Sequence, residues 1–324
     1  MTTNVRAGRR RLAIFGALAL AFLVLGACGS SGGGSGQQSG PMPIKVGVAT
    51  GAGPLNADIA EAKGYFKKRG LEAHFQVLNG AGAEGVAALQ SGSLDVVESN
   101  IGSVIAGSQH GITTPCFTGG VKYNNELNVP LEARPEIQKP NQLAGKKVAV
   151  VSTNSANQIL VDAYLKANHV DWKSVDYLAM GIPNMMAAMK NGAVDGALIG
   201  NPWATQWKQQ GGSVLAVNMA TYVGSPAFSC WIASKSWLQN HRSTAKAFIA
   251  GLDEADAYFH SNRHEADVAG SPLAKVPAAT LDAQGTWEYT TQMNASDVQK
   301  WFDAGKEFGI FHGTINMGNV YAPA

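Results

Sequence analysis

Hydrophobic residues recur along the chain in short runs whose spacing alternates between that of strands and that of helices. Ile44–Thr50 is an apolar run typical of a buried strand, and the apolar positions of 55–66 recur at helical spacing. A strand with alternating polar and apolar positions at 73–77, a helix at 82–90 and an apolar strand at 94–97 follow. This alternation predicts a parallel β-sheet covered by helices.

The same order of elements returns later in the chain. The pattern predicts strands at 147–151, 175–179 and 194–199 and helices at 155–168 and 183–190. The letters repeat as well, because Ala88–Asp95 reads ALQSGSLD and Ala188–Asp195, 100 residues on, reads AMKNGAVD. In both segments a glycine ends a helix and an aspartate leads into the next strand. We therefore expect two similar α/β lobes.

Two segments connect these lobes. Residues 113–144 are rich in Pro, Asn and Gly and lead into the second lobe, and 222–226 lead out of it. The apolar run 227–233 has the pattern of a strand that returns to the first lobe. Two connections of this kind predict a hinge. The predicted boundaries are 43–118 plus 225–324 for lobe 1 and 119–224 for lobe 2.

The N-terminal pattern differs from the rest of the chain. A basic cluster at Arg6–Arg11 precedes an uncharged apolar run of 16 residues, Leu12–Ala27, which ends at Cys28. This run is shorter than the roughly 20 residues that span a bilayer, so it predicts a secretory signal and not a transmembrane helix. A cysteine after small residues resembles the lipobox of bacterial lipoproteins, which implies that Cys28 carries a lipid. Residues 1–28 are then the signal peptide and 29–42 a Gly/Ser-rich tether.

The net charge and its distribution limit the classes of molecule that the protein could bind. The whole chain has a formal net charge of +2, and loss of the four leader arginines leaves about −2. Neither a basic stripe nor a basic run with interleaved aromatic residues is present, which argues against nucleic acid as a partner. We expect a monomer on the extracytoplasmic face of the cell membrane, anchored by the lipid on Cys28. The leader leaves open whether export uses the general or the twin-arginine route.

Two further cysteines, Cys116 and Cys230, lie on the two segments that connect the lobes. Thiols in an exported chain tend to pair, so we expect a disulfide that joins these segments. The alternative is a pair of buried free thiols, which are common core residues.

Four segments carry a family resemblance. They are Glu61–Leu71, Gly80–Leu89 with Gly92 and Asp95, Gln142–Val150, and Ala187–Asp195. In this order they resemble the nitrate/sulfonate/taurine-type solute-binding proteins of ABC importers, a group within the thiamine-pyrimidine-synthase-like superfamily. The resemblance implies a type II periplasmic-binding-protein fold, with two βαβ lobes joined by a two-segment hinge. It also implies closure on a small ligand, which is delivered to a permease and its ATPase.

Candidate ligand contacts follow from where ligands bind in such lobes, beyond the carboxyl ends of the strands and at helix N-termini. The loops at these places hold Ser, Thr, Asn and Gly but no Lys, Arg or His, so an anion there would depend on N–H groups and hydroxyls. Ordinary helix capping is the alternative role for the polar residues, and packing is the alternative for Trp203. We expect contacts from Gly53, Asn56, Ser99, Asn100, Tyr123, Thr153, Asn154, Ser155, Asn157, Trp203 and Tyr222. Trp207 is expected in the core.

Other chemistries find less support in the sequence. His260 and His264 have helical metal-ligand spacing but lack a third ligand segment, and Gly80–Gly85 fits a dinucleotide-binding pattern without a convincing acidic partner. We therefore expect no metal, no cofactor and no catalytic group. The fold leaves two alternatives to transport: an enzyme of the thiamine-pyrimidine-synthase-like group, or a ligand-binding sensor. The cargo, whether aliphatic sulfonate, taurine or nitrate, is not fixed by the sequence.

Overall fold

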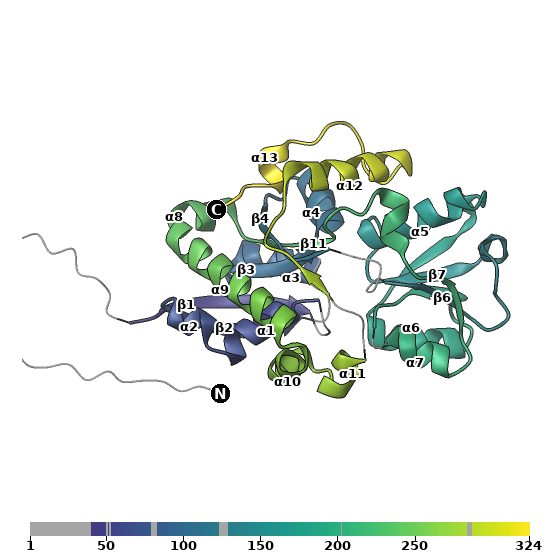
Figure 1. The fold of residues 1–324 in the computed structure, drawn as a ribbon. Helices are drawn as coiled ribbons and strands as arrows, with labels where there is room; N and C mark the ends of the chain where they lie inside the picture. The colour runs from purple at the N-terminus through teal and green to yellow at the C-terminus, as the bar shows by residue number, and fades with distance from the viewer. Residues whose placement is uncertain are drawn as a thin grey trace, which may run out of the picture. The chain divides into compact units, whose positions relative to one another are not determined.

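Two five-stranded sheets organise the chain in a computed structural model (Figure 1). The structure describes residues 40–324 except 50, 52, 79–82, 123–128, 202 and 284–286, and Gly40–Ala324 forms one unit. The expected signal peptide, most of the tether, Cys28 with its expected lipid, and the candidate Tyr123 lie outside the described residues. Among the described helices, none has the length and apolar character needed to cross a membrane.

The first sheet has the order β2-β1-β3-β11-β4. Its strands are β1 (Met42–Ala49), β2 (Leu71–Leu78), β3 (Val96–Asn100), β4 (Cys116–Gly119) and β11 (Ser229–Ile232). β1 pairs in parallel with β2 and β3, whereas β11 is antiparallel to both β3 and β4. The connecting helices are α1 (Leu55–Ala62), α2 (Tyr65–Lys68), α3 (Ala83–Ser91) and α4 (Ile101–Gln109). The predicted helix over 55–66 is divided in two because Gly64 takes a left-handed φ of +73°.

The second sheet has the order β10-β6-β9-β7-β8. Its strands are β6 (Leu131–Ala133), β7 (Lys147–Val150), β8 (Asp176–Ala179), β9 (Gly196–Leu198) and β10 (Ser213–Ala216). β7 is parallel to β8 and β9, and β6 is antiparallel to β9 and β10. Its helices are α5 (Ala156–Ala167), α6 (Ile182–Lys190) and α7 (Trp203–Gln209), with short 3-10 turns η1 (Pro140–Leu143), η2 (Trp172–Ser174) and η3 (Met219–Val223). The prediction of two similar α/β lobes is thus confirmed, although both sheets are mixed: antiparallel pairs join β11 and β6 to the parallel strands.

Two predicted strands start later than the apolar pattern indicates. The backbone N–H groups of Leu94 and Val194 each donate to the carbonyl of a residue in the preceding helix, Ala88 and Ala188 respectively, at 3.2 Å. These residues therefore close the end of a helix, and β3 and β9 begin two residues further on.

The segments that connect the lobes are bonded to each other. Cys116 of β4 and Cys230 of β11 form the expected disulfide, with 5.6 Å between their Cα atoms. Beyond β4, β5 (Val121–Lys122) leads toward the second sheet, and the Val121 carbonyl accepts a hydrogen bond from Phe228 N at 2.8 Å. The outgoing and returning segments therefore run side by side.

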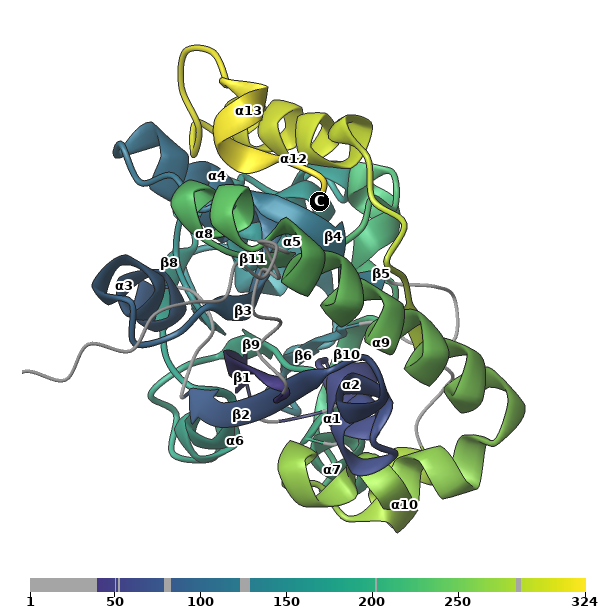
Figure 2. The same ribbon diagram turned by 90° about the vertical axis from the view of Figure 1, so that its left-hand side faces the viewer.

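The C-terminal elements complete the first lobe (Figure 2). They are α8 (Lys235–Asn240), α9 (Arg242–Ser261), α10 (Arg263–Ala274), α11 (Ala278–Asp282), β12 (Glu288–Tyr289), α12 (Ala295–Glu307) and α13 (Met317–Val320). α9 buries Phe248 against Phe66 of α2 and Trp231 of β11, with ring centroids 4.9 Å and 5.0 Å apart. In the second lobe α6 and α7 cover the sheet with Met185, Met189 and Trp207.

Candidate functional site

The N-termini of two helices meet where the lobes come together. α4 follows β3 of the first sheet, and α5 follows the loop after β7 of the second. A Cβ atom added at Gly102, in the first turn of α4, would overlap the backbone N of Ala156, the first residue of α5. Only glycine allows this approach, which brings two positive helix-dipole ends to one junction. We call this place the α4–α5 junction.

The first lobe contributes Ser99 and Asn100 at the end of β3. Asn100 is the N-cap of α4, and its Oδ1 accepts a hydrogen bond from Ser103 N at 2.9 Å. Ser99 is fully buried, and its hydroxyl has no hydrogen-bond partner in the described part of the chain. Asn100 therefore serves as a cap, whereas the Ser99 hydroxyl is unused by the fold.

The second lobe contributes the loop between β7 and α5. Ser155 is the N-cap of α5, yet its hydroxyl donates to the Ser152 carbonyl at 2.6 Å and makes no cap bond to the helix. The buried Ser152 hydroxyl has no partner within the described residues. Thr153 and Asn154 are exposed, and Asn157 is buried in the first turn of the helix. The start of α5 is thus left without a side-chain cap, although the sequence there is rich in capping residues.

Trp203 reaches the first lobe from the start of α7. Its ring atoms Cζ3 and Cη2 lie 3.8 Å and 3.9 Å from the position that a Cβ atom would take on Gly51, which has a φ of +111°. The Gly51 N–H donates to the Ala274 carbonyl at 3.0 Å, so α10 fixes this loop. Gly53, in the same loop, has open space where a side chain would stand. Trp207 is buried in the core as expected, and its Nε1 donates to the Ala133 carbonyl at 2.8 Å.

Two predicted contacts lie elsewhere. Asn56 is buried inside the first lobe, where its Nδ2 donates to Asp256 Oδ1 of α9 at 2.9 Å and its Oδ1 accepts from Ala57 N. Tyr222 packs edge-to-face on Tyr164, with centroids 5.4 Å apart and two turns along α5 from the junction. Asn56 is therefore held by an intralobe bond and Tyr222 by an aromatic contact, and we leave both out of the candidate site.

Three carboxyl groups within the two lobes have raised pKa values. Glu98, two residues before Asn100 on β3, is only 8% exposed, and burial raises its pKa to about 7, against the opposing effect of a hydrogen bond from Ser229. Burial raises the pKa of Asp256, the partner of Asn56, to about 7. Glu132 of β6 is 1% exposed and burial raises its pKa to about 8, although Lys208 opposes the shift.

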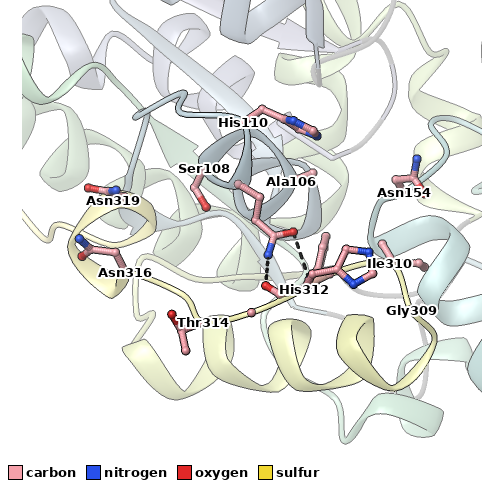
Figure 3. A pocket seen from close by; sticks show the side chains of 13 residues that line it. Ala106, Ser108, His110, Asn154, Gly309, Ile310, His312, Thr314, Asn316 and Asn319 are labelled. Carbon is pink, nitrogen blue, oxygen red and sulfur yellow. Dashed lines mark hydrogen bonds between the residues drawn. The ribbon is translucent and has the colours of Figure 1, made fainter.

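A cavity of about 710 Å³ lies beside the second half of α4 (Figure 3). The second half of α4 and the chain from Gly309 to Asn319 line it, and Asn154 of the second lobe is the one residue that it shares with the predicted site. Gln109 also lines it, and its side chain hydrogen-bonds the backbone of His312. Its residues come from segments 200 positions apart, so no local sequence pattern could have predicted it.

One of the two histidines considered as metal ligands contacts an aspartate. His264 Nδ1 lies 2.6 Å from Asp282 Oδ2, and this contact raises the pKa of His264 above its ordinary value. Within the described residues no group of three or more His, Cys, Asp or Glu side chains fits a metal ion.

Comparison with known proteins gives one family and several relatives. Residues 57–266 match the family model described as NMT1/THI5 like. The taurine-binding periplasmic protein of Escherichia coli K12 is 27% identical over 229 residues, which are 69% of this chain and 69% of that protein. Two solved structures share the fold. The aliphatic sulphonate binding protein SsuA of Escherichia coli has a TM-score of 0.69 at 19% identity, over 88% of this chain and 93% of that one. The nitrate-binding protein NrtA of Synechocystis PCC 6803 has a TM-score of 0.72 at 15% identity, over 86% and 84%.

Proposed function

The chain belongs to the NMT1/THI5-like family, and from this membership we propose that it is a solute-binding lipoprotein of an ABC importer. In this proposal it captures a small organic or oxyanion solute outside the cytoplasm by closure of its two lobes. It then delivers the solute to a permease and its ATPase, and it carries out no chemistry on it. The taurine-binding relative and the type II fold shared with sulphonate- and nitrate-binding proteins support this function.

The observation that carries the proposal is the α4–α5 junction. Two helix N-termini meet there, and the buried hydroxyls of Ser99 and Ser152 have no partner among the described residues. A buried hydroxyl without a partner costs free energy unless a ligand satisfies it. Sulfonate and nitrate oxygens accept hydrogen bonds from hydroxyl and backbone N–H groups, so an oxyanion is a suitable partner for these hydroxyls and for the N–H groups at the helix starts.

Trp203 and Gly51 favour a solute with a carbon part. The indole ring from one lobe lies against a glycine of the other, which forms an apolar wall beside the polar junction. An aliphatic sulfonate or taurine would use both surfaces, whereas nitrate would use only the polar one. The proposed contacts are Gly53, Ser99, Asn100, Tyr123, Thr153, Asn154, Ser155, Asn157 and Trp203.

A ligand screen tests the function. We expect one of taurine, alkanesulfonates or nitrate to raise the melting temperature, since a ligand at 100 times its Kd stabilises by about 2.7 kcal/mol. Calorimetry on Trp203→Ala should then show weaker binding of a sulfonate, while Trp237→Ala, which removes a tryptophan on α8 of the first lobe, should leave the affinity unchanged. A folded protein that responds to none of these compounds would contradict the proposed cargo class.

The membrane anchor has its own test. We propose that Cys28 is acylated and holds a monomer on the outer face of the cell membrane. Cells that express the protein and are fed a radiolabelled fatty acid should label it, and Cys28→Ser should abolish the label and release the protein from the membrane fraction. Retention of Cys28→Ser in that fraction would argue for another mode of attachment.

A further inference from the structure

A second set of contacts joins the lobes away from the candidate site. Lys166, near the end of α5, forms an ion pair with Glu307, the last residue of α12. Trp172 of η2 packs edge-to-face on Phe308, with ring centroids 5.4 Å apart. Each pair joins a residue of the second lobe to one of the first. We call these four residues the α12 clasp.

α12 is fixed firmly to the first lobe. Asn294 and Asp297 form a capping box at its N-terminus. Trp301 Nε1 donates to the Ala227 carbonyl at 2.7 Å, and Asp297 Oδ1 accepts from Ala227 N at 3.2 Å. Ala227 lies just before β11, on the segment that returns from the second lobe. The helix is therefore anchored at the hinge. It contacts the second lobe through Lys300 Nζ, which donates to the Gly224 carbonyl at 3.5 Å, and through its C-terminal end.

The clasp and the candidate site lie at different places along the boundary between the lobes. Lys166 lies ten residues along α5 from Ala156, which corresponds to about 15 Å of helix. In both ribbon views β4 and β11 lie between α12 on one side and α7, which carries Trp203, on the other (Figures 1 and 2). A rotation about the hinge must therefore change the clasp as well as the contact between Trp203 and Gly51.

Both contacts are present in the same structure. The arrangement that brings Trp203 to Gly51 also forms the clasp, so each contact stabilises the arrangement that the other requires. A cavity of about 710 Å³ lies beside this boundary, between Asn154 and the 309–319 segment. Around the clasp, apolar residues of α5 and of the first lobe pack in one hydrophobic cluster, so the clasp adds to an existing contact between the lobes.

We propose that the α12 clasp sets the solute affinity from outside the binding site, by stabilising the lobe arrangement in which Trp203 meets Gly51. The inference rests on the proposed function, because a solute that binds this arrangement gains affinity as its population rises. Lys166, Trp172, Glu307 and Phe308 are thus positioning residues, and none of them belongs to the proposed ligand contacts.

The test reverses one charge of the clasp. Lys166 and Glu307 are both about half exposed, so Glu307→Lys should fold, and it replaces an attraction by a repulsion. The matched control is Glu254→Lys, which breaks ion pairs with Lys68 and Arg69 inside the first lobe. The double variant Lys166→Glu/Glu307→Lys restores the pair with its charges exchanged.

Two measurements distinguish the role of the clasp from the proposed solute-binding function. Nitroxide labels at Gln90→Cys and Gln206→Cys, on a Cys28→Ser background, report the distance between lobes without any solute. We expect Glu307→Lys to shift this distance distribution, the charge exchange to restore it, and Glu254→Lys to leave it unchanged. Calorimetry with taurine should show about two- to fivefold weaker binding for Glu307→Lys, and recovery in the double variant.

A distance distribution that does not change in Glu307→Lys, or that changes equally in Glu254→Lys, overturns the clasp. Tighter taurine binding by Glu307→Lys also overturns it, because the contact would then oppose the binding arrangement. If the wild-type protein binds no taurine, taurine is rejected as the solute. The distances measured without solute then test by themselves whether the clasp stabilises the lobe arrangement.

Discussion

The two lobes have the same strand order but different cores. β2-β1-β3-β11-β4 in the first sheet corresponds to β8-β7-β9-β6-β10 in the second. In each, the strand that enters from the other lobe, β11 or β6, is antiparallel and lies next to the third parallel strand. The lobes therefore share a topology in which each completes its sheet with a strand that comes from the other.

The repeated helix–strand junction explains why the topology is the same. Gly92 and Gly192 take φ values of +72° and +75° and end α3 and α6. Asp95 and Asp195 then accept a hydrogen bond from the backbone of β1 or β7, through Lys45 N at 2.8 Å and Lys147 N at 3.0 Å. A local turn and one side-chain bond thus set the entry of the third strand in both lobes.

The cores differ because more helices pack on the sheet of the first lobe. Phe248 of α9 contacts Phe66, Phe117 and Trp231, so aromatic rings join α9 to α2 and to two strands. The face of the second sheet under α6 and α7 is filled mainly by aliphatic residues and methionines. Aromatic side chains pack with defined geometry, whereas methionine adapts its shape, so we expect the first lobe to tolerate truncation less well.

Truncation of Phe248 should give the largest effect. Phe248→Ala removes a fully buried ring with three aromatic neighbours and should lower the free energy of unfolding by about 3–5 kcal/mol. Met189→Ala is the matched change in the second lobe, with an expected loss of about 2–3 kcal/mol because its neighbours can rearrange. Urea denaturation of both variants measures the difference. A larger loss for Met189→Ala would show that the methionine core is the more specific of the two.

Loss of the disulfide should act on the connection between the lobes. The bond joins residues 114 positions apart, and the loop it closes contains the whole second sheet. Cys116→Ser/Cys230→Ser should therefore lower stability by about 2–4 kcal/mol, since the unfolded chain gains freedom. Thermal unfolding with and without reductant provides the measurement. If a strong reductant leaves the melting temperature of the wild-type protein unchanged, the disulfide does not contribute to stability.

The buried acids of the two sheets make stability fall as pH rises. Below about 4.5, the ordinary pKa of a glutamate, folded and unfolded chains both hold the proton. Between that value and the raised pKa, only the folded chain holds it, so deprotonation favours unfolding. The window ends near pH 7 for Glu98 and near pH 8 for Glu132.

Removing the ionisable group should therefore stabilise the protein at pH 9. Glu132→Gln should gain on the order of 2–3 kcal/mol there relative to the wild type, and little at pH 4. Glu98→Gln should gain less, because its window is narrower and Ser229 already stabilises its charge. Chemical denaturation at the two pH values measures both. Equal gains at pH 4 and pH 9 would show that packing, not ionisation, is responsible.

The strand–helix units, the disulfide and the core position of Trp207 could be predicted from sequence because each depends on local pattern or on compartment. The burial of Asn56 could not, since its partner Asp256 is 200 residues away. The close approach of Gly102 to Ala156 could not be predicted either, because no pattern in one segment indicates that it contacts the other. Local sequence patterns predict the helices and strands. Contacts between segments distant in the sequence determine which buried polar side chains have no hydrogen-bond partner.

The repeated aspartates provide the finest comparison. Asp95→Ala and Asp195→Ala each leave a strand N–H without its carboxylate, which should cost about 1–2 kcal/mol because water can reach both places. Asp195 Oδ1 also lies 3.8 Å from an Arg134 guanidinium nitrogen, a contact that Asp95 lacks among the described residues. Asp195→Ala should thus cost a further ~0.2–1 kcal/mol, the range of a partly exposed ion pair.

A double-mutant cycle isolates that small difference. Arg134→Ala should lower the free energy of unfolding less when residue 195 is already alanine. Its effect should add fully to that of Asp95→Ala, because the Asp95 carboxylate accepts its hydrogen bond from Lys45 in the other lobe. Urea denaturation of the three single and two double variants gives both coupling energies. Equal coupling to the two aspartates would mean that the effect of Arg134 passes through the whole fold, and that the two junctions are energetically the same. Coupling to Asp195 alone would show that the second lobe added an ion pair to a junction that the first lobe forms without one.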